Sequence, residues 1–219
     1  MHMKSYGLCA ILSIALAGTA SASLRITEVM SSSNGGGSPT ADWFEVTNYG
    51  SSSISLAGLR MDDNSFSFGV SRELLGLTSI GAGETVIFLE TAGGAAIDSF
   101  RTFWGGLAGV QIGYYSGSGV SFASGGDGMV LFNAAGTEIS ARVNFGAATS
   151  GSSFFWGYDA LGNIDPAFDA VVSTVGTIGT QVGFSSSGDT GSLGTALGIP
   201  APGALALLGL AGLAARRRR

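Results

Sequence analysis

Cysteine and histidine are almost absent from this 219-residue sequence, which contains one of each, Cys9 and His2. Both lie within the first nine residues, in a stretch that is expected to be removed (see below). The rest of the chain has neither residue type. This absence excludes a disulfide framework, thiolate-held zinc, and nucleophilic catalysis by cysteine or histidine. The stability of this part must come from a packed core, with a hard cation such as Ca²⁺ as the remaining metal option.

Positive charge is scarce as well. Of the 10 Lys and Arg residues, five lie in the two terminal segments, at Lys4 and 216–219, whereas all 15 Asp and Glu residues lie between them. The part of the chain between the terminal segments thus carries five basic against 15 acidic residues, a net charge near −10. Such a surface repels phosphates, so we expect no nucleic-acid partner.

Helix-length amphipathic periods are rare, and no phosphate-binding loop or nucleophile elbow occurs. Instead, Gly, present 37 times, and Ser separate short β-branched and aromatic runs. This pattern predicts an all-β sandwich or barrel.

The first 22 residues are typical of a secretory signal peptide. Lys4 supplies the positive charge, Leu8–Ala17 is mostly apolar, and Ala20 and Ala22 mark a small-residue cleavage site. We expect cleavage to leave Ser23 as the first residue. A first transmembrane helix is the alternative, which the short apolar run disfavours.

The last 21 residues, 199–219, have three parts. Pro200 and Pro202 stop any upstream helix, because proline fixes φ and lacks the backbone N–H. Next, Ala204–Ala215 contains only Ala, Leu and Gly. A helix of this length is about 18 Å long, against a hydrocarbon core of about 30 Å. A terminal arginine cluster follows, and such clusters stay on the cytoplasmic side of a membrane.

In its order of parts this segment resembles the PEP-CTERM protein-sorting tail of Gram-negative bacteria. The family motif is Pro-Glu-Pro, and this chain has Ala201 in place of the glutamate. The resemblance implies that an exosortase, a membrane protease, recognises the tail, and that the exported protein is released or transferred to the surface. Cleavage by a variant enzyme and simple membrane retention both remain open. The motif residues are Ile199, Pro200, Ala201, Pro202 and Gly203, and the orienting residues are Arg216, Arg217, Arg218 and Arg219.

Between the terminal segments, alternating apolar residues predict the strands. The second strand, Asp42–Asn48, places Trp43, Glu45 and Thr47 on one face and Phe44 and Val46 on the other. A helical turn or two is expected at Asp98–Trp104. The other predicted strands are Leu24–Met30, Ser53–Met61, a short strand beginning at Phe66 and Phe68, Thr85–Glu90, and the hairpin of Met129–Asn133 and Thr137–Phe145.

Five short motifs follow one another between the terminal segments: Arg25–Met30, Asp42–Asn48, Ser55–Leu59, Ile80–Glu84 leading into Val86–Leu89, and Gly126–Gly128 before Val130–Phe132. In this order they resemble the lamin-tail domain. The resemblance implies an immunoglobulin-like β-sandwich, and it implies that Glu28 and Glu45 tie strands and loops together. It also implies a surface or accessory module, as in bacterial members of that family.

The expected organisation has five parts. After residue 146 the strand pattern loosens, and 185–194 is rich in Ser and Gly, which is typical of a flexible linker. The parts are a signal peptide at 1–22, the lamin-tail-like sandwich at 23–146, an additional β and loop region at 147–184, a Ser/Gly linker at 185–198 and the sorting tail with its membrane helix at 199–219.

Three groups of residues are candidates for chemistry. Glu28 and Glu45 lie on neighbouring predicted strands, and paired carboxylates are what acid–base hydrolysis without histidine requires. Asp62, Asp63 and Asn64 offer oxygen ligands for Ca²⁺, although Asx turns explain the same residues. The third candidate, an aromatic cluster able to stack on sugars, comprises Phe154, Phe155, Trp156 and Tyr158, of which at least half should be core.

These features favour a non-enzymatic, exported protein of the cell envelope or extracellular space, with a structural or adhesive role and no required cofactor. Its expected partners are the Sec export machinery, an exosortase-type protease, the membrane through the C-terminal helix, and extracellular polysaccharide. A carbohydrate- or Ca²⁺-dependent binding module is the first alternative, and a carboxylate hydrolase is the second.

Overall fold

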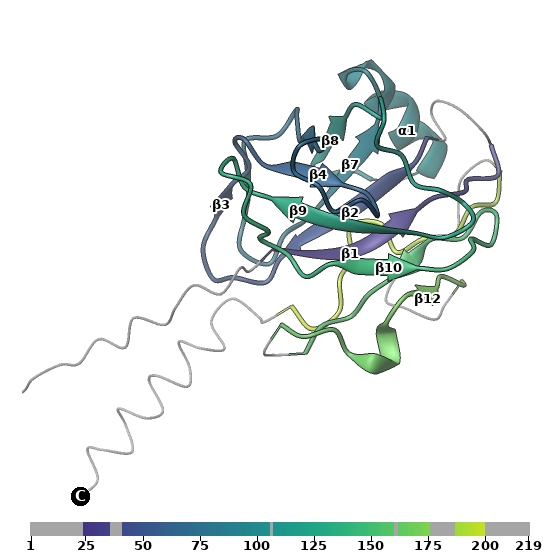
Figure 1. Cartoon of the computed structure of the whole chain (residues 1–219). Helices are drawn as coiled ribbons and strands as arrows, with labels where there is room; N and C mark the ends of the chain where they lie inside the picture. The colour runs from purple at the N-terminus through teal and green to yellow at the C-terminus, as the bar shows by residue number, and fades with distance from the viewer. Residues whose placement is uncertain (1–23, 36–40, 106, 160–161, 176–186, 200–219) are drawn as a thin grey trace, which may run out of the picture.

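A computed structural model describes residues 24–35, 41–105, 107–159, 162–175 and 187–199 (Figure 1). The predicted signal peptide, its cleavage site and the predicted tail beyond Ile199 lie outside these ranges. Regular structure is mostly β-strand, with one short α-helix, so the all-β prediction is confirmed. Among the described residues, no helix combines the length and apolar character needed to cross a membrane.

Two main sheets pack face to face (Figure 1). One has six strands in the order β12-β11-β1-β2-β7-β8, and the other has four in the order β10-β9-β4-β5. The six-stranded sheet comprises β1 (Leu24–Met30), β2 (Trp43–Asn48), β7 (Thr85–Glu90), β8 (Ile112–Tyr115), β11 (Phe154–Phe155) and β12 (Val171–Val172). The four-stranded sheet comprises β4 (Arg60–Asp62), β5 (Arg72–Glu73), β9 (Asp127–Phe132) and β10 (Val143–Phe145). A small third sheet joins β3 (Ile54–Ser55) to β6 (Ser79–Ile80).

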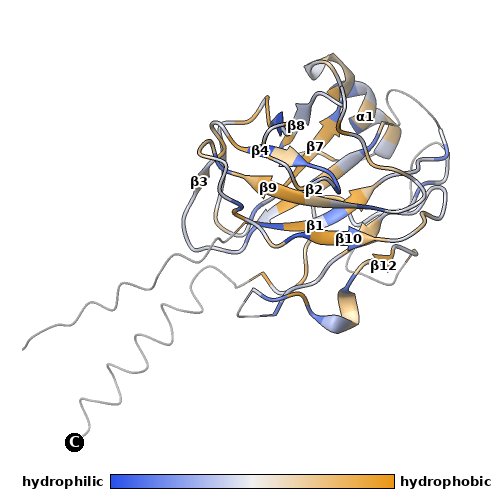
Figure 2. Cartoon of the chain, viewed as in Figure 1, coloured by the Kyte–Doolittle hydropathy of each residue, from blue (hydrophilic) through white to orange (hydrophobic). Residues whose placement is uncertain are grey.

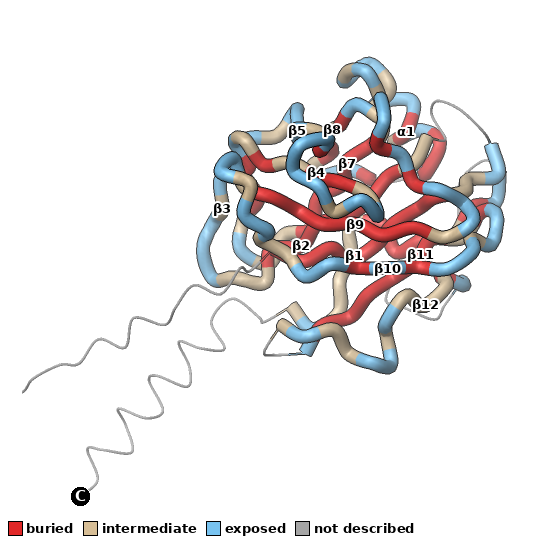
Figure 3. The backbone as a smooth tube through the Cα atoms, viewed as in Figure 1, coloured by how far each residue is buried: buried red, intermediate tan, exposed pale blue. Residues whose placement is uncertain are grey.

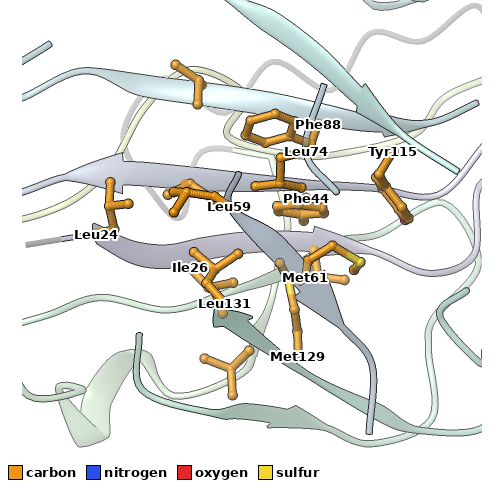
Figure 4. Close-up of a cluster of buried hydrophobic side chains, with 14 of the residues drawn as sticks. Leu24, Ile26, Phe44, Leu59, Met61, Leu74, Phe88, Tyr115, Met129 and Leu131 are labelled. Atoms are coloured by element: carbon orange, nitrogen blue, oxygen red, sulfur yellow. The ribbon is translucent and has the colours of Figure 1, made fainter. Parts of the chain in front are cut away.

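The main core lies between the two large sheets. Phe44 of β2 stacks on Phe88 of β7, with ring centroids 5.4 Å apart. Met61 and Leu131 meet this layer from the four-stranded sheet (Figure 4). Among the described residues, the long strands β2, β7 and β9 are rich in apolar residues and deeply buried (Figures 2 and 3). The predicted division of the second strand into two faces is therefore confirmed, since Phe44 and Val46 lie in this core and Trp43 does not.

A second, smaller core covers the opposite face of the six-stranded sheet. There, Trp43 lies edge-on to Phe100 and Trp104 of helix α1 (Ile97–Trp104), at centroid distances of 6.3 and 5.7 Å. The helix ends at Gly105, whose left-handed φ of 61° suits glycine. The helix predicted at Asp98–Trp104 is therefore confirmed.

The parallel strand β8 was not predicted. It pairs with β7 in the register Ile87 to Ile112 and Leu89 to Tyr114, after the chain has crossed over through α1. Gly113 permits this pairing because a β-carbon there would lie 2.6 Å from the Phe88 ring. The sequence of β8 is too short and too glycine-rich to carry a strand pattern of its own.

Two predicted strands between β2 and β7 are wrong. The stretch Ser53–Met61 is divided into β3 and β4 by a turn at Gly58, where φ is +71° and the Leu59 N–H donates to the Leu56 carbonyl. Phe66 and Phe68 do not begin a strand, since Phe66 has φ of 47° within a turn. The strand that follows is β5 instead.

The predicted hairpin after β9 is only partly correct. The turn at residues 134–136 forms, with the Asn133 N–H donating to the Thr137 carbonyl. The returning strand is limited to β10, whereas residues 137–142 contribute a single bridge, from Glu138 to Phe132.

Residues beyond 146 complete the six-stranded sheet rather than forming a separate region. β11 pairs with β1 in the register Glu28 to Phe155, and β12 pairs with β11. Residues 147–175, where described, therefore extend the sandwich.

The described part of the predicted linker also packs on the domain. We call residues 187–199 the C-terminal strap. Asp189 and Ser192 are fully buried, and Leu193 joins the second core beside Trp43. In Figure 1 the strap, in yellow, runs behind β1 and β2, on the side away from β9. The prediction of a flexible Ser/Gly linker thus differs from the structure at 187–198.

Candidate functional site

The two predicted carboxylates face each other at the centre of the six-stranded sheet. Glu28 of β1 is the direct cross-strand partner of Glu45 of β2, immediately after a register shift between Ile26 and Glu28. Both side chains are 0% exposed. Because cross-strand neighbours have their β-carbons about 5 Å apart, the two buried carboxyl groups lie close to each other.

The hydrogen-bond donors to Glu28 come from the C-terminal half of the chain. The Ser192 N–H donates to Oε1 at 2.8 Å, and the Ser192 hydroxyl donates to Oε2 at 2.6 Å. The Ser153 hydroxyl also donates to Oε1. Glu28 therefore fastens the strap and the segment before β11 to the first strand.

Glu45 has fewer partners. Its Oε1 accepts the Gly194 N–H at 2.5 Å, and its Oε2 has no partner among the described residues. A lone buried carboxylate oxygen is costly unless it carries a proton. The strap thus places one backbone donor against a carboxyl group that lacks a full set of partners.

Glycines let the strap approach so closely. A β-carbon on Gly191 would lie 2.9 Å from Glu28 Oε1 and 2.7 Å from Leu193. Gly194 has φ of +75°, and a β-carbon there would lie 2.8 Å from Val110. The Ser and Gly composition that resembles a linker is here the composition of a close-fitting segment.

The strap is also hydrogen-bonded to the domain on both sides of the carboxyl pair. At its start, Asp189 accepts hydrogen bonds from the Ser33 hydroxyl at 2.5 Å and the Asn34 N–H at 2.9 Å. Near its end, the Tyr49 hydroxyl donates to the Leu197 carbonyl at 2.6 Å. The strap therefore runs from the segment before β11, where Thr190 bridges to Ser152, to the loop after β2.

The strap ends beside the beginning of the domain. Leu24, the first described residue, pairs with Asn48, whose carbonyl accepts the Gly83 N–H at 2.9 Å. A β-carbon on Gly83 would lie 3.1 Å from Ile199 Cγ2. Both ends of the described domain thus lie at one end of the sandwich, which we call the entry end.

Burial governs the electrostatics of the pair. Desolvation raises the pKa of Glu28 to about 7, against hydrogen bonds from Ser153 and Ser192 that lower it. Desolvation, and then the charge of Glu28, raise the pKa of Glu45 well above its usual value. The pair therefore retains a proton under conditions in which exposed glutamates are ionised.

This geometry does not suit a hydrolase. Two carboxylates that act on a substrate must be reachable by it, and these are buried beneath the strap. Glu28 and Glu45 instead tie strands to loops through hydrogen bonds, as the lamin-tail resemblance implies. The pair itself was predictable from its strand positions, whereas its covering by residues 191–194 was not.

The candidate calcium ligands form a turn. Asp62 Oδ2 accepts hydrogen bonds from the Ser65 hydroxyl at 2.6 Å and the Ser67 N–H at 2.7 Å, and Asp63 Oδ1 accepts the Ser65 N–H at 3.2 Å. The Asn64 N–H donates to Asp127. Among the described residues, no three acidic, His or Cys side chains group as a metal would require. The contacts match the Asx-turn interpretation.

A second set of carboxylates lies at the other end of the sandwich. Asp127 accepts backbone N–H bonds from Asn64, Ala123 and its own neighbour Gly128, which closes the turn before β9. Burial, and then the nearby charge of Glu90, raise the pKa of Asp42 to about 7. Asp42 also accepts the Phe122 N–H at 3.1 Å. These carboxylates therefore hold loops in place.

The predicted aromatic cluster belongs to the interior. All four rings are buried, with exposed fractions no higher than 5%. Phe154 stacks on Phe145 at 4.8 Å, and the Tyr158 hydroxyl donates to the Ile26 carbonyl at 2.6 Å. A sugar cannot stack on rings that are covered on both faces. The residues concerned are Phe154, Phe155, Trp156 and Tyr158.

Comparison with protein families gives one match. The model of the Lamin Tail Domain family matches residues 17–146, more than half of the chain. No curated protein matches this sequence. The matched span contains Glu28 and Glu45 but stops before β11 and the strap, so the segments that cover the carboxyl pair lie outside it.

Proposed function

Because this chain belongs to the lamin tail domain family, we propose that its structural β-sandwich is a non-enzymatic module of an exported bacterial protein that a PEP-CTERM-like tail directs to the cell surface or the extracellular space. The family match supports the module. The three-part order of residues 199–219 supports the tail, and the predicted signal peptide at 1–22 supports export.

The observation that carries the proposal is the position of the two ends. Leu24 and Ile199 both lie at the entry end of the sandwich, linked through Asn48 and Gly83. A tail that begins at Ile199 would therefore leave the domain on the side where the exported chain begins. The rest of the sandwich is then free to face away from a membrane.

The charge distribution agrees with this arrangement. Four arginines end the sequence, whereas the region between the two terminal segments carries 15 acidic and five basic residues. Clustered arginines remain on the cytoplasmic side of a membrane, and an acidic domain is kept away from anionic headgroups. We propose an exosortase-type protease and the Sec machinery as its processing partners, with extracellular polysaccharide as the surroundings of the mature protein.

Neutralising the terminal arginines should impair sorting while leaving the domain folded. We expect a variant with Arg216–Arg219→Gln to lose most of the surface or released protein that the wild type yields in a Gram-negative host with an exosortase system, because the orienting charge is gone. The measurement is immunodetection in cytoplasmic, membrane, surface and medium fractions.

The matched control is Arg142→Gln, which removes an exposed arginine that pairs with Glu138 on the sandwich. This variant should sort as the wild type does. Equal distribution of the wild type and the four-arginine variant, or retention of the wild type in the cytoplasm, would overturn the proposed function.

A further inference from the structure

The strap is fixed at its centre by two acidic side chains rather than by a strand ladder. Its backbone N–H groups at Ser192 and Gly194 donate to Glu28 and Glu45, and one bridge, from Thr190 to Ser152, attaches it to the segment before β11. By contrast, β1 and β2 share six registered pairs. The strap is therefore expected to detach from the sheet before β1 and β2 separate.

We propose that Glu28 and Glu45 form a pH-sensitive latch, which holds the C-terminal strap on the sheet while the pair retains a proton and releases the strap once both carboxyl groups are ionised. The ligand of the latch is the chain's own segment 187–199.

The geometry disfavours simultaneous ionisation of Glu28 and Glu45 while the strap is docked. The two carboxyl groups are directly opposed across neighbouring strands, both are fully buried, and Glu45 Oε2 has no described partner. The strap donors satisfy one carboxylate well, since Ser192 bonds both oxygens of Glu28. A second charge on the opposed, fully buried partner carries a large desolvation cost, which is relieved when the strap lifts and exposes the pair to solvent.

No neighbouring cation offsets that second charge in the described part of the chain. Arg101 of α1 directs its guanidinium to the carbonyls of Leu107 and Val110. Arg25 of β1 donates to the carbonyls of Gly162 and Leu24. The other titratable groups on the strap and on neighbouring elements are acids or tyrosines: Asp189, Glu84, Glu90, Asp98, Tyr49 and Tyr158.

The sign of the effect follows from burial. With the pKa of Glu28 raised from 4.5 to about 7 and that of Glu45 raised well above its usual value, the docked state binds protons that the released state gives up. Docking is therefore strongest below pH 4.5 and weakens as the pH rises through about 7, with Glu45 adding to the loss in the same direction.

The consequence for sorting depends on the proposed function. Ile199 begins the tail motif, and in the docked state it lies against Gly83. Release of residues 190–199 would add up to about 33 Å of chain between the sandwich and the motif, at roughly 3.3 Å per residue. The latch would then determine how freely a membrane protease reaches the tail.

Hydrogen exchange on the full-length protein tests the latch without any sorting machinery. We expect the protection of amides in 190–197, corrected for intrinsic rate, to fall by about tenfold or more per pH unit between about pH 5 and 7, because the docked state keeps at least one proton there that the released state has lost. Amides of β9 should remain protected. In Glu45→Gln the strap should remain protected up to pH 8.5, with Glu28→Gln as the second variant if the first does not fold.

The control is Glu138→Gln, whose exposed carboxyl pairs with Arg142 and lies outside the site; it should behave as the wild type. Protection of the strap that is independent of pH would overturn the latch, as would equal sensitivity of the wild type and both Gln variants. Loss of β9 protection together with the strap would also overturn it. A latch that works in a protein whose tail is never processed would overturn the proposed function alone.

Discussion

Glu28→Ala is expected to lower the free energy of unfolding at pH 5 by about 2–4 kcal/mol, because buried donors left without acceptors cost about 1–3 kcal/mol each. The substitution removes the acceptor of the Ser192 N–H and the Ser192 hydroxyl, two strap donors that are buried against the sheet. Glu28→Gln retains an acceptor and the side-chain volume, so it should cost less than about 1.5 kcal/mol. Chemical denaturation of the full-length chain is the measurement.

The alanine control for this experiment is Glu138→Ala, at an exposed carboxyl whose surface ion pair with Arg142 contributes little to stability. If Glu28→Ala were as mild as this control, the hydrogen bonds between strap and sheet would not contribute to stability. The C-terminal strap would then pack on the domain without stabilising its fold.

Trp43→Ala should destabilise the protein by about 3–5 kcal/mol, the usual cost of removing a buried tryptophan. Trp43 is 1% exposed and lies edge-on to Phe100 and Trp104, so its loss leaves a cavity under α1. We also expect the near-ultraviolet circular dichroism of the remaining tryptophans to weaken, since Trp104 loses its ring partner.

Phe68→Ala is the matched aromatic control. Phe68 is 38% exposed and contacts Phe132 at the surface of the four-stranded sheet, so its replacement should cost less than about 1.5 kcal/mol. A Trp43→Ala variant as stable as Phe68→Ala would show that the second core, under helix α1, does not hold the helix to the sheet.

The central strands could be predicted because their sequences follow a single rule. In Thr85–Glu90 and Leu24–Met30 both faces of the strand are buried, each strand contains four apolar residues, and the boundaries were correct. In Asp42–Asn48 the alternation distinguished the two faces, including the position of Glu45 opposite Glu28. Local pattern was sufficient wherever a strand packs on both sides.

The missed elements depend on partners that are distant in sequence. β8 is a strand because the edge of β7 is available for parallel pairing. Glycine is needed at position 113 because a β-carbon there would clash with the Phe88 ring. The turn at Phe66, with a positive φ that phenylalanine rarely adopts, is a tertiary effect that propensity cannot reveal.

The strap was missed for a related reason. From sequence alone, a Ser/Gly composition predicts a flexible segment. In the structure, however, Gly191 and Ser192 pack closely against Glu28. The one sequence signal was indirect: two glutamates in buried strands require donors, and strands β1 and β2 supply none from their own side chains. Such a requirement predicts a covering segment without identifying it.

Export and sorting are the central claim, and the intact mass of the protein isolated from its native envelope or medium tests them most directly. The account predicts a chain that begins at Ser23 and ends within the motif Ile199–Gly203, with the strap retained on the domain. A chain that still runs from Met1 to Arg219 would contradict both export and sorting, and one from Ser23 to Arg219 would contradict cleavage of the tail.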